Sequence, residues 1–390
     1  MRALRLLPTL VLPACLAGAL LWVVAPALSL TPYRPEPKDF EQALPDVERI
    51  GGPGNAVRSS TGGGHGDGGA VRFVSPVIDA PARFDLVGVG GELHALEYRG
   101  RLEGEEWTEW VETANGDPVY FGGADELQVR SRGVRPEGEL HYVNVSGSDT
   151  FATRVLTTAR EAVNSAFLSV ASVASAGAGP PQPDMVSRRE WGAKDDCRPR
   201  TGPAYGGVSA AVAHHTVSAN DYGRDEAPGI VLGICRFHRN GNGWNDIGYN
   251  FLVDRFGDVY VGRSGGTRKA VVGAHAAGYN AQTTGISSIA DHTSAPVSDA
   301  TENAIVDVIA WKLALHGAKA TGRTRLVSSG GSSNRFPAGK KVRVKRVFGH
   351  RRVSPTQCPG QLNSVLKRIR AAAQERIAEH GGLPPPEPAD

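Results

Sequence analysis

The chain has 390 residues, and at about 100–200 residues per domain this length predicts two domains. Its 43 Lys and Arg against 40 Asp and Glu leave a net charge of +3, which excludes the chain-wide basic excess typical of nucleic-acid binding, so we expect no nucleic-acid partner. Four cysteines exclude a disulfide scaffold, and 49 glycines with 26 prolines stay below the ~25–30% that marks a wholly disordered chain.

The N-terminal segment predicts export. Two arginines near its start precede an uncharged run over residues 6–30, and residues 25–27 have the small-x-small pattern of a cleavage site. We therefore predict a signal peptide over residues 1–27, with an uncleaved membrane anchor and a lipid-modified Cys15 as the alternatives. The cleaved protein is expected to have no stable membrane span and to be secreted or held in the cell wall.

The next two segments differ in texture. Residues 28–70 are punctuated by proline and glycine, and the glycine-rich run at 62–69 predicts a flexible segment. Over residues 71–150 short alternating runs, such as 84–89 and 127–130, are broken by turn signals. This pattern predicts a small all-β, sandwich-like domain.

A linker rich in alanine, serine, glycine and proline is predicted over residues 151–184, then a second domain over 185–378 and a disordered tail over 379–390. Inside the second domain strand-like runs alternate with helical patterns, which predicts the α/β class. The strand-like runs are 208–214, 249–253 and 259–261, and the helical patterns are 228–239, 299–316 and 362–373.

Side chains that can bind a metal stand out in the second domain. His214 and His215 end a strand-like run, and His350 and Cys358 lie on a proline-containing loop that can close on one ion. Two imidazoles and one thiolate suit zinc, and three protein ligands leave the fourth tetrahedral position open, as in catalytic zinc sites. Only one of His214 and His215 can face such a site, and strand alternation does not say which. Core or surface roles for each side chain are the alternative.

The cysteine count supports a metal role for one sulfur. After removal of a signal peptide, Cys197, Cys235 and Cys358 remain, an odd number in an oxidising compartment. One pair can form a disulfide, and metal ligation is the commonest role for the sulfur that is left over.

Several ordered motifs run through nearly half of the chain. They are S-R-R-E-W-G-A at 187–193, V-A-H-H-T at 212–216, G-W-N-D-I-G-Y-N-F at 243–251, V-Y-V-G-R at 259–263, G-A-H at 273–275 with G-Y-N at 278–280, and G-H-R at 349–351 with C-P-G at 358–360. In combination they resemble the family of peptidoglycan recognition proteins and zinc N-acetylmuramoyl-L-alanine amidases. The resemblance implies a central mixed β-sheet flanked by helices, with zinc in a groove on one side.

The resemblance also assigns roles to residues. It implies that His214, His350 and Cys358 are the zinc ligands and that Tyr249 is the catalytic tyrosine beside the zinc-bound water. Thr356 is a further catalytic candidate, but a related phage enzyme has lysine at this position, so a second group that stabilises the oxyanion is in doubt.

The implied function is that of a secreted zinc hydrolase that cleaves the amide bond between N-acetylmuramic acid and L-alanine in peptidoglycan. A non-catalytic peptidoglycan-binding protein is the main alternative, although family members of that kind have typically lost the cysteine that is Cys358 here. A zinc peptidase that cuts within the stem peptide is another alternative.

The groove of this family holds glycan and stem peptide, and the chain is expected to act as a monomer. The residues expected to contact substrate are His238, Trp244, His275 and Asn280. For each of them a purely structural role is the alternative.

Two further expectations concern the second domain. Cys197, in the loop after the 187–193 motif, and Cys235, on the helix after the His214 strand, are predicted to form a disulfide that leaves out Cys358. The segment 328–343, rich in glycine, serine, lysine and arginine, is interpreted as a solvated insertion, with contact to an anionic wall polymer as the alternative.

Overall fold

The computed structural model describes residues 36–50, 70–90, 96–113, 117–133, 135–146, 179–218, 220–293 and 295–383. All of them belong to one compact unit that spans Pro35–Asp390. The predicted signal peptide, the glycine-rich run, most of the predicted linker and the end of the predicted tail lie outside the described residues. Among the described helices, none combines the length and the apolar character needed to cross a membrane.

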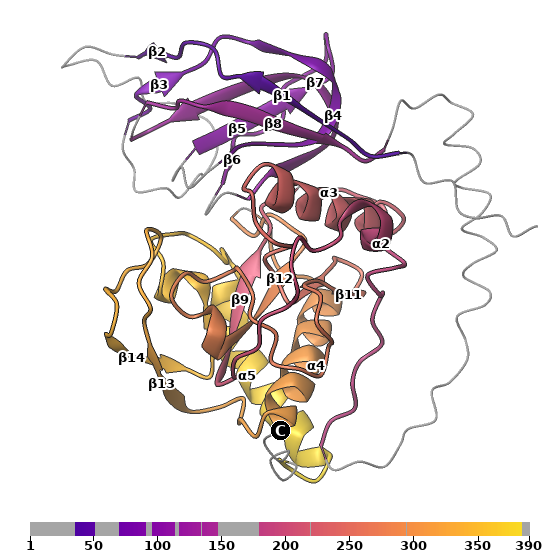
Figure 1. Ribbon diagram of the computed structural model, residues 1–390, viewed down its shortest axis with the longest axis vertical. Helices are drawn as coiled ribbons and strands as arrows, with labels where there is room; N and C mark the ends of the chain where they lie inside the picture. Colours follow the sequence, from indigo (N-terminus) through magenta and orange to yellow (C-terminus); the bar gives the residue numbers. More distant parts are fainter. Residues whose placement is uncertain are drawn as a thin grey trace, which may run out of the picture. The chain divides into compact units, whose positions relative to one another are not determined.

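The N-terminal strands form one antiparallel sheet, which we call the β-sheet domain (Figure 1). Its strand order is β1-β8-β4-β7-β3-β2, and β5 and β6 join it beside β7. The strands are β1 (Lys38–Ala43), β2 (Glu48–Arg49), β3 (Phe73–Val74), β4 (Ile78–Val89), β5 (Leu96–Arg101), β6 (Val111–Glu112), β7 (Val119–Ser131) and β8 (Glu139–Asn144).

Strands β1 and β2 correct the prediction that residues 28–70 are flexible throughout. All six residues of β1 pair with β8 in antiparallel register, and the ring of Phe40 stacks on Tyr142 at a centroid distance of 5.0 Å. The proline and glycine content of this segment hid the strand, because β1 is held by its partner strand and by one aromatic contact, not by a strong alternation of its own.

The second domain is built around a five-stranded mixed sheet with the order β11-β10-β12-β9-β15. Only the pairing of β11 with β10 is antiparallel. The strands are β9 (Ala210–His215), β10 (Phe251–Val253), β11 (Val259–Val261), β12 (Thr283–Ser288) and β15 (Val347–Gly349). This architecture, with the helices that flank it, confirms the predicted α/β class.

Helices cover both faces of this sheet (Figure 1). Phe251 and Val253 of β10 share a core with α4 (Asp299–Leu315) and α5 (Leu362–Glu379). Leu252, between them, belongs to a second core with α3 (Ala227–Asn240), as the period of two along a strand requires. The short α2 (Ala193–Asp196) lies beside α3.

The β-sheet domain packs closely against α3. Leu86, Tyr120 and Val143 belong to the same core cluster as the buried residues of α3. The approach is close because glycine lies at the contact: a Cβ on Gly233 would lie 2.2 Å from Cδ1 of Leu86. At the rim of this contact Nε of Arg236 donates a hydrogen bond to Oδ1 of Asp39 at 2.7 Å.

A separate two-stranded antiparallel sheet joins β13 (Arg323–Val327) to β14 (Lys341–Lys345). Leu326, Val342 and Val344 turn inward and pack with Phe348 of β15. The alternate residues of both strands are left to solvent.

Candidate metal centre and active site

His214 lies at the end of β9 and projects from the face of the central sheet opposite α4 and α5. Ala213, its neighbour, belongs to the core shared with those two helices, so strand alternation puts His214 on the other face together with Val212. Position on the strand therefore decides which histidine of the doublet can meet the loop that carries His350 and Cys358.

His215 projects from the face of the sheet that packs against α4 and α5, and it has a different environment. Its Nδ1 accepts a hydrogen bond from the backbone N–H of His292 at 3.0 Å, so it carries no proton and forms no ion pair with Asp291, 3.8 Å away. Burial lowers the pKa of His215 to about 3, in agreement with a neutral ring.

The structure brings His214, His350 and Cys358 together. His350 begins a 3₁₀ turn after β15, and Cys358 follows on the same loop. One ligand atom from each of the three residues lies within 4.8 Å of the others, and all three side chains are buried. Nδ1 of His214 is 3.7 Å from Sγ of Cys358, and the rings of His214 and His350 are 4.5 Å apart between centroids.

This donor set fits a zinc ion. Burial lowers the pKa of His350 to about 3 and, together with the neighbouring histidines, lowers the pKa of His214, so both imidazoles are neutral and keep a lone pair. Burial raises the pKa of the Cys358 thiol well above its usual range, so this sulfur loses its proton only when a cation compensates the charge. Two neutral imidazoles and one thiolate sulfur are ligands that zinc prefers.

His275 stands behind His214. Its Nδ1 lies 3.1 Å from Nε2 of His214, the ring nitrogen that does not face Cys358. Burial lowers the pKa of His275 to about 3, so the contact joins two neutral rings, one of which donates while the other accepts. A partner of this kind orients a metal-binding imidazole.

Tyr249 completes the candidate active site. Its ring lies 5.3 Å from that of His214, and only 4% of the residue is exposed. Its hydroxyl donates a hydrogen bond to Oδ2 of Asp117 at 2.7 Å. Burial, and then the charge of Asp117, raise the pKa of Tyr249 well above its usual range, so the phenol keeps its proton.

The four residues expected to contact substrate do not form one open wall. His238 and His275 are buried; His238 packs against Trp244 at 4.6 Å between ring centroids, and His275 contacts His214. Asn280 uses its side-chain oxygen to accept the backbone N–H groups of His275 and Ala276, both at 2.9 Å. Trp244 is half-buried. His238 and His275 are thus placed to support the side chains that they contact, and their contact with substrate stays a prediction.

Thr356 lies on the loop that carries Cys358. Its hydroxyl accepts the backbone N–H of Cys358 at 3.0 Å. This contact holds the ligand loop in place, and the hydroxyl proton remains available for another acceptor.

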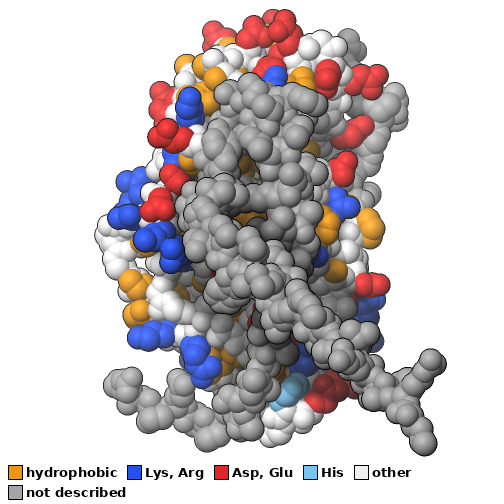
Figure 2. Space-filling view, turned by 90° about the vertical axis from the view of Figure 1, so that its right-hand side faces the viewer, with side chains coloured by type: hydrophobic (Ala, Val, Ile, Leu, Met, Phe, Trp, Pro, Cys, Tyr) orange, Lys and Arg blue, Asp and Glu red, His pale blue; other side chains and the backbone are white. Residues whose placement is uncertain are grey.

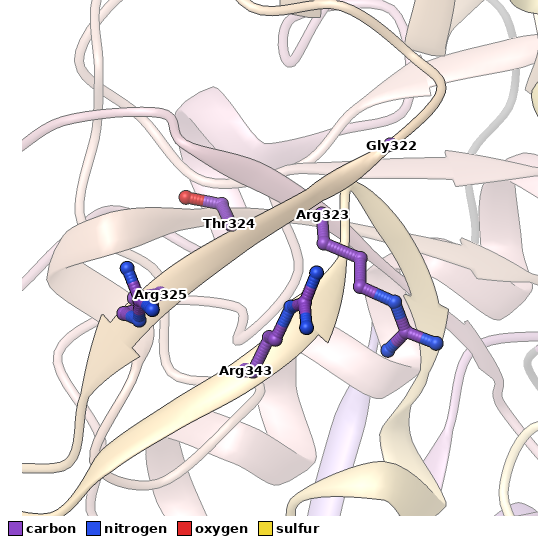
Figure 3. A pocket seen from close by; sticks show the side chains of 5 residues that line it. All are labelled: Gly322, Arg323, Thr324, Arg325 and Arg343. Carbon is purple, nitrogen blue, oxygen red and sulfur yellow. The ribbon is translucent and has the colours of Figure 1, made fainter.

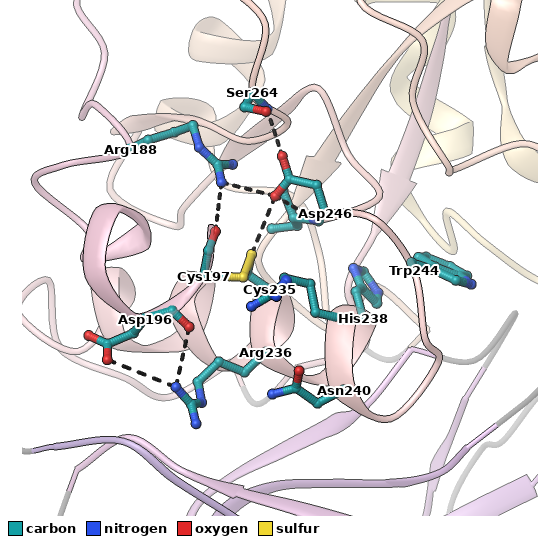
Figure 4. Close-up of a disulfide and its surroundings, with 12 residues drawn as sticks. Arg188, Asp196, Cys197, Cys235, Arg236, His238, Asn240, Trp244, Asp246 and Ser264 are labelled. Carbon is teal, nitrogen blue, oxygen red and sulfur yellow. Dashed lines mark hydrogen bonds and ion pairs between the residues drawn. A yellow bond between two sulfur atoms is a disulfide. The ribbon is translucent and has the colours of Figure 1, made fainter. Parts of the chain in front are cut away.

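Cys197 and Cys235 form a disulfide that links the end of α2 to α3, while Cys358 is a free, buried thiol (Figure 4). Asp246 lies beside the disulfide, where its carboxylate accepts a hydrogen bond from Arg188 at 2.9 Å and from the backbone of Ser264 at 2.8 Å. The two sulfurs and Asp246 are also close enough to hold an ion, but the disulfide takes both thiols out of metal chemistry.

Sequence reasoning missed Asp117. The segment 115–118 looks like an ordinary turn, and nothing in its composition predicts a contact with the second domain. The signal is tertiary: Asp117 reaches both Tyr249 and His238, more than a hundred residues away along the chain.

Comparison with known proteins gives the family. A model of the family described as N-acetylmuramoyl-L-alanine amidase matches residues 204–361. The peptidoglycan-recognition protein SC2 of Drosophila simulans is 32% identical over 178 residues, which cover 45% of this chain and 80% of the relative.

The chain belongs to the family of peptidoglycan-recognition proteins and N-acetylmuramoyl-L-alanine amidases.

Solved structures similar to this chain include wild-type PGRP-LB of Drosophila, with 26% identity, coverage of 48% of this chain and 91% of that one, and a TM-score of 0.35. The endolysin N-acetylmuramoyl-L-alanine amidase LysCS of Clostridium intestinale is 22% identical, with coverage of 50% and 97% and a TM-score of 0.35. In the present chain the segment that matches the family model, residues 204–361, contains the three candidate ligands and Tyr249. Asp117 and the β-sheet domain lie outside this segment.

Proposed function

We propose that this chain is a secreted, monomeric, zinc-dependent N-acetylmuramoyl-L-alanine amidase, which hydrolyses the amide bond between N-acetylmuramic acid and L-alanine in peptidoglycan. The observation that carries the proposal is the buried set of His214, His350 and Cys358, with the hydroxyl-bearing ring of Tyr249 beside it. The retained Cys358 supports an enzyme over a protein that only binds the wall.

His214, His350 and Cys358 would hold the zinc ion and leave one tetrahedral position open. Bound there, zinc would supply Lewis acidity and a water of lowered pKa as the nucleophile. The chain's own residues supply orientation: His275 fixes the ring of His214, and Thr356 fixes the backbone of Cys358.

Tyr249 would act on the substrate itself. A protonated phenol can donate a hydrogen bond to the oxygen of the scissile carbonyl as negative charge develops on it. One such donor in a buried site lowers the barrier by about 2.7–4 kcal/mol. The high pKa of Tyr249 supports this role, because the phenol remains a donor at neutral and moderately alkaline pH.

The names of the relatives support peptidoglycan as the partner. The pattern of the first 27 residues and the disulfide between Cys197 and Cys235 support export, because disulfides persist in oxidising compartments.

The test is digestion of purified sacculi with the zinc-loaded full chain, followed by mass analysis of the released fragments. Intact stem peptides with a new free L-alanine amine are expected. Shortened stem peptides would indicate a peptidase, and sedimentation with the wall without release would indicate a binding protein; either result contradicts the proposal. Cys358→Ser is the matched inactive control, and light scattering tests the monomer.

A further inference from the structure

Asp117 of the β-sheet domain reaches into the candidate active site. It lies two residues before β7, and only 9% of it is exposed. Its Oδ2 accepts the hydroxyl proton of Tyr249 at 2.7 Å, and its Oδ1 lies 2.9 Å from Nε2 of His238. Nδ1 of His238 accepts the backbone N–H of Gly248 at 3.1 Å, so in the neutral ring Nε2 carries the proton and donates it to Asp117.

The packing around Asp117 holds this contact in place. Three residues after it, in β7, Tyr120 is buried in the core shared with α3, and its hydroxyl lies 3.4 Å from Oε1 of Glu226. Elsewhere in the interface between the β-sheet domain and α3, Asp39 forms an ion pair with Arg236. The packed interface between the β-sheet domain and the second domain therefore holds the Asp117 carboxylate next to Tyr249.

The chemistry of this contact opposes the proposed reaction. A phenol has one proton, and Tyr249 donates it to Asp117, so it has none to give to a substrate carbonyl. A carboxylate at this distance also repels the negative charge that develops on that oxygen. An oxygen of Asp117 thus occupies the position beside the Tyr249 hydroxyl that the carbonyl oxygen of the substrate would have to occupy.

We propose that Asp117 is a built-in competitor of the substrate: the docked β-sheet domain occupies the carbonyl position beside Tyr249, and hydrolysis requires the carboxylate to leave. This inference rests on the proposed amidase function, and it names the regulation of that same site.

The test compares full-length variants on a small soluble muramyl peptide. Asp117→Ala removes the competing oxygens, and Arg236→Glu repels Asp39 and loosens the docked domain without touching the site. We expect kcat/KM to rise about tenfold in both. Asp125→Asn is the matched control, because Asp125 pairs with Arg83 within the β-sheet domain and is partly exposed. An unchanged or lower kcat/KM in Asp117→Ala would overturn the proposal.

A second readout does not depend on hydrolysis. Calorimetry with the same muramyl peptide, on chelator-treated protein, is expected to show about tenfold tighter binding by Asp117→Ala than by the unmodified chain. Tighter binding by Asp117→Ala, without turnover in any variant, would refute the amidase function and would still support competition between Asp117 and the ligand. Equal binding would refute the competitor. If Asp117→Ala does not fold, Asp117→Leu decides, because it keeps about the size of the side chain and removes both oxygens.

An independent observation concerns the exposed face of the β13–β14 sheet. Arg323 lies opposite Lys345, Arg325 opposite Arg343, and Val327 opposite Lys341. All six side chains are exposed, so five cations share one face of two short strands. Among the described residues none of these cations has a carboxylate within 4 Å.

Like charges directly opposite each other destabilise a strand pair, so this face carries an electrostatic cost. An open hollow of about 570 Å³ lies over it, lined by Gly322, Arg323, Thr324, Arg325 and Arg343 (Figure 3). Guanidinium groups on both strands can bind phosphate oxygens in a two-pronged manner.

The net charge of +3 concealed this surface because the acidic side chains gather elsewhere. Exposed glutamates cluster between β5 and β6, at Glu103, Glu105, Glu106 and Glu109. On the face shown in Figure 2, acidic side chains gather toward the top, and lysines and arginines lie lower in the view. On this face the acidic side chains are therefore most numerous toward one end, although some also lie lower, among the cations.

We propose that this face of the β13–β14 sheet binds a phosphodiester-linked anionic polymer of the cell wall. The choice of a wall polymer over a nucleic acid rests on the proposed function and on the short length of the basic face. The polymer would hold the enzyme at the wall beside its substrate.

The test is sedimentation of the full chain with immobilised poly(glycerol phosphate) at several salt concentrations, which does not involve hydrolysis. Replacing Arg325 and Arg343 by glutamate together is expected to weaken binding at least tenfold and to reduce the salt dependence. Arg72→Glu combined with Arg189→Glu, which changes two exposed arginines elsewhere, is the charge-matched control and should bind as the unmodified chain does. Unchanged binding by the double variant, or tighter binding of duplex DNA than of the polymer at equal salt, would overturn the proposal.

Discussion

Nδ1 of His275 lies 3.1 Å from Nε2 of His214, while the other ring nitrogen of His214 faces Cys358. The contact is possible because two glycines leave room for the ring of His275: a Cβ on Gly285 would lie 2.4 Å from its Cγ, and a Cβ on Gly273 2.5 Å from its Cδ2. One ring nitrogen of His214 is thus committed to orientation, and the other is free to bind a metal.

We predict that His275→Ala lowers zinc affinity about 10–100-fold, the usual effect of losing the partner of a metal-binding histidine. Competition with a fluorescent zinc chelator measures it. The exposed His380→Ala is the control. Wild-type affinity in His275→Ala would show that the contact does not orient the ligand.

Cys358→Ser is predicted to lose zinc. A neutral hydroxyl lacks the charge and the softness of a thiolate, so two imidazoles alone would remain to hold the ion. Metal analysis of the purified variant should find little zinc, and its turnover should disappear. Full zinc content together with full activity would show that Cys358 is not a ligand.

Tyr249→Phe removes one hydroxyl and keeps the packing of the ring. Turnover should fall about 10²–10³-fold with zinc content unchanged, because one donor to the developing oxyanion is lost. In the unmodified chain the hydroxyl that is removed is also the one that donates to Asp117, so the loss measured there does not isolate the contact of Tyr249 with substrate. The comparison is therefore made in the Asp117→Ala background as well, where the full loss is expected; an unchanged rate there contradicts the role of Tyr249.

The grouping of His214, His350 and Cys358 could be predicted from the sequence, because the three residues lie in motifs whose order and residue types are specific. The choice between His214 and His215 rested on the resemblance; the structure gives the physical reason in the packing of Ala213 against α4 and α5. Strand alternation by itself says only that His214 and His215 face opposite sides of the sheet, and not which of them meets the loop that carries His350 and Cys358.

The contact of Asp117 with Tyr249 could not be predicted in the same way. It depends on how the β-sheet domain docks on α3, and this docking is decided by apolar side chains such as Leu86 that look like ordinary strand core. The burial of His238 has the same origin, because its partner Asp117 comes from another domain. Local sequence contains no information on either contact.

Removing the disulfide is predicted to destabilise the second domain. Cys197 and Cys235 are 38 residues apart, and closing a loop of this size contributes about 3–4 kcal/mol in the chain-entropy model. Chemical denaturation of a Cys197→Ser/Cys235→Ala variant should show a loss of this order. Its zinc content should be unchanged, because Cys358 is not part of the bridge. A variant as stable as the unmodified chain would contradict the prediction.

The stability of the metal-free protein should fall as the pH falls from about 6.5 to about 3. Burial lowers the pKa of His215 and of His275 from 6.5 to about 3. Between these values the unfolded chain binds a proton at each site and the folded chain does not, so acid favours unfolding; above about 6.5 both states are neutral and the stability is complete. Each histidine contributes a slope of about 1.4 kcal/mol per pH unit.

Urea denaturation of chelator-treated protein at several pH values measures this slope. His215→Asn removes one of the titrating groups, so its slope should be shallower by about 1.4 kcal/mol per pH unit. The exposed His380→Asn should leave the slope as it is. A free energy of unfolding that stays constant down to pH 4 would contradict the prediction, because it would mean that the buried histidines take up protons in the folded protein. The imidazoles of the candidate metal site would then become charged and could not serve as neutral ligands.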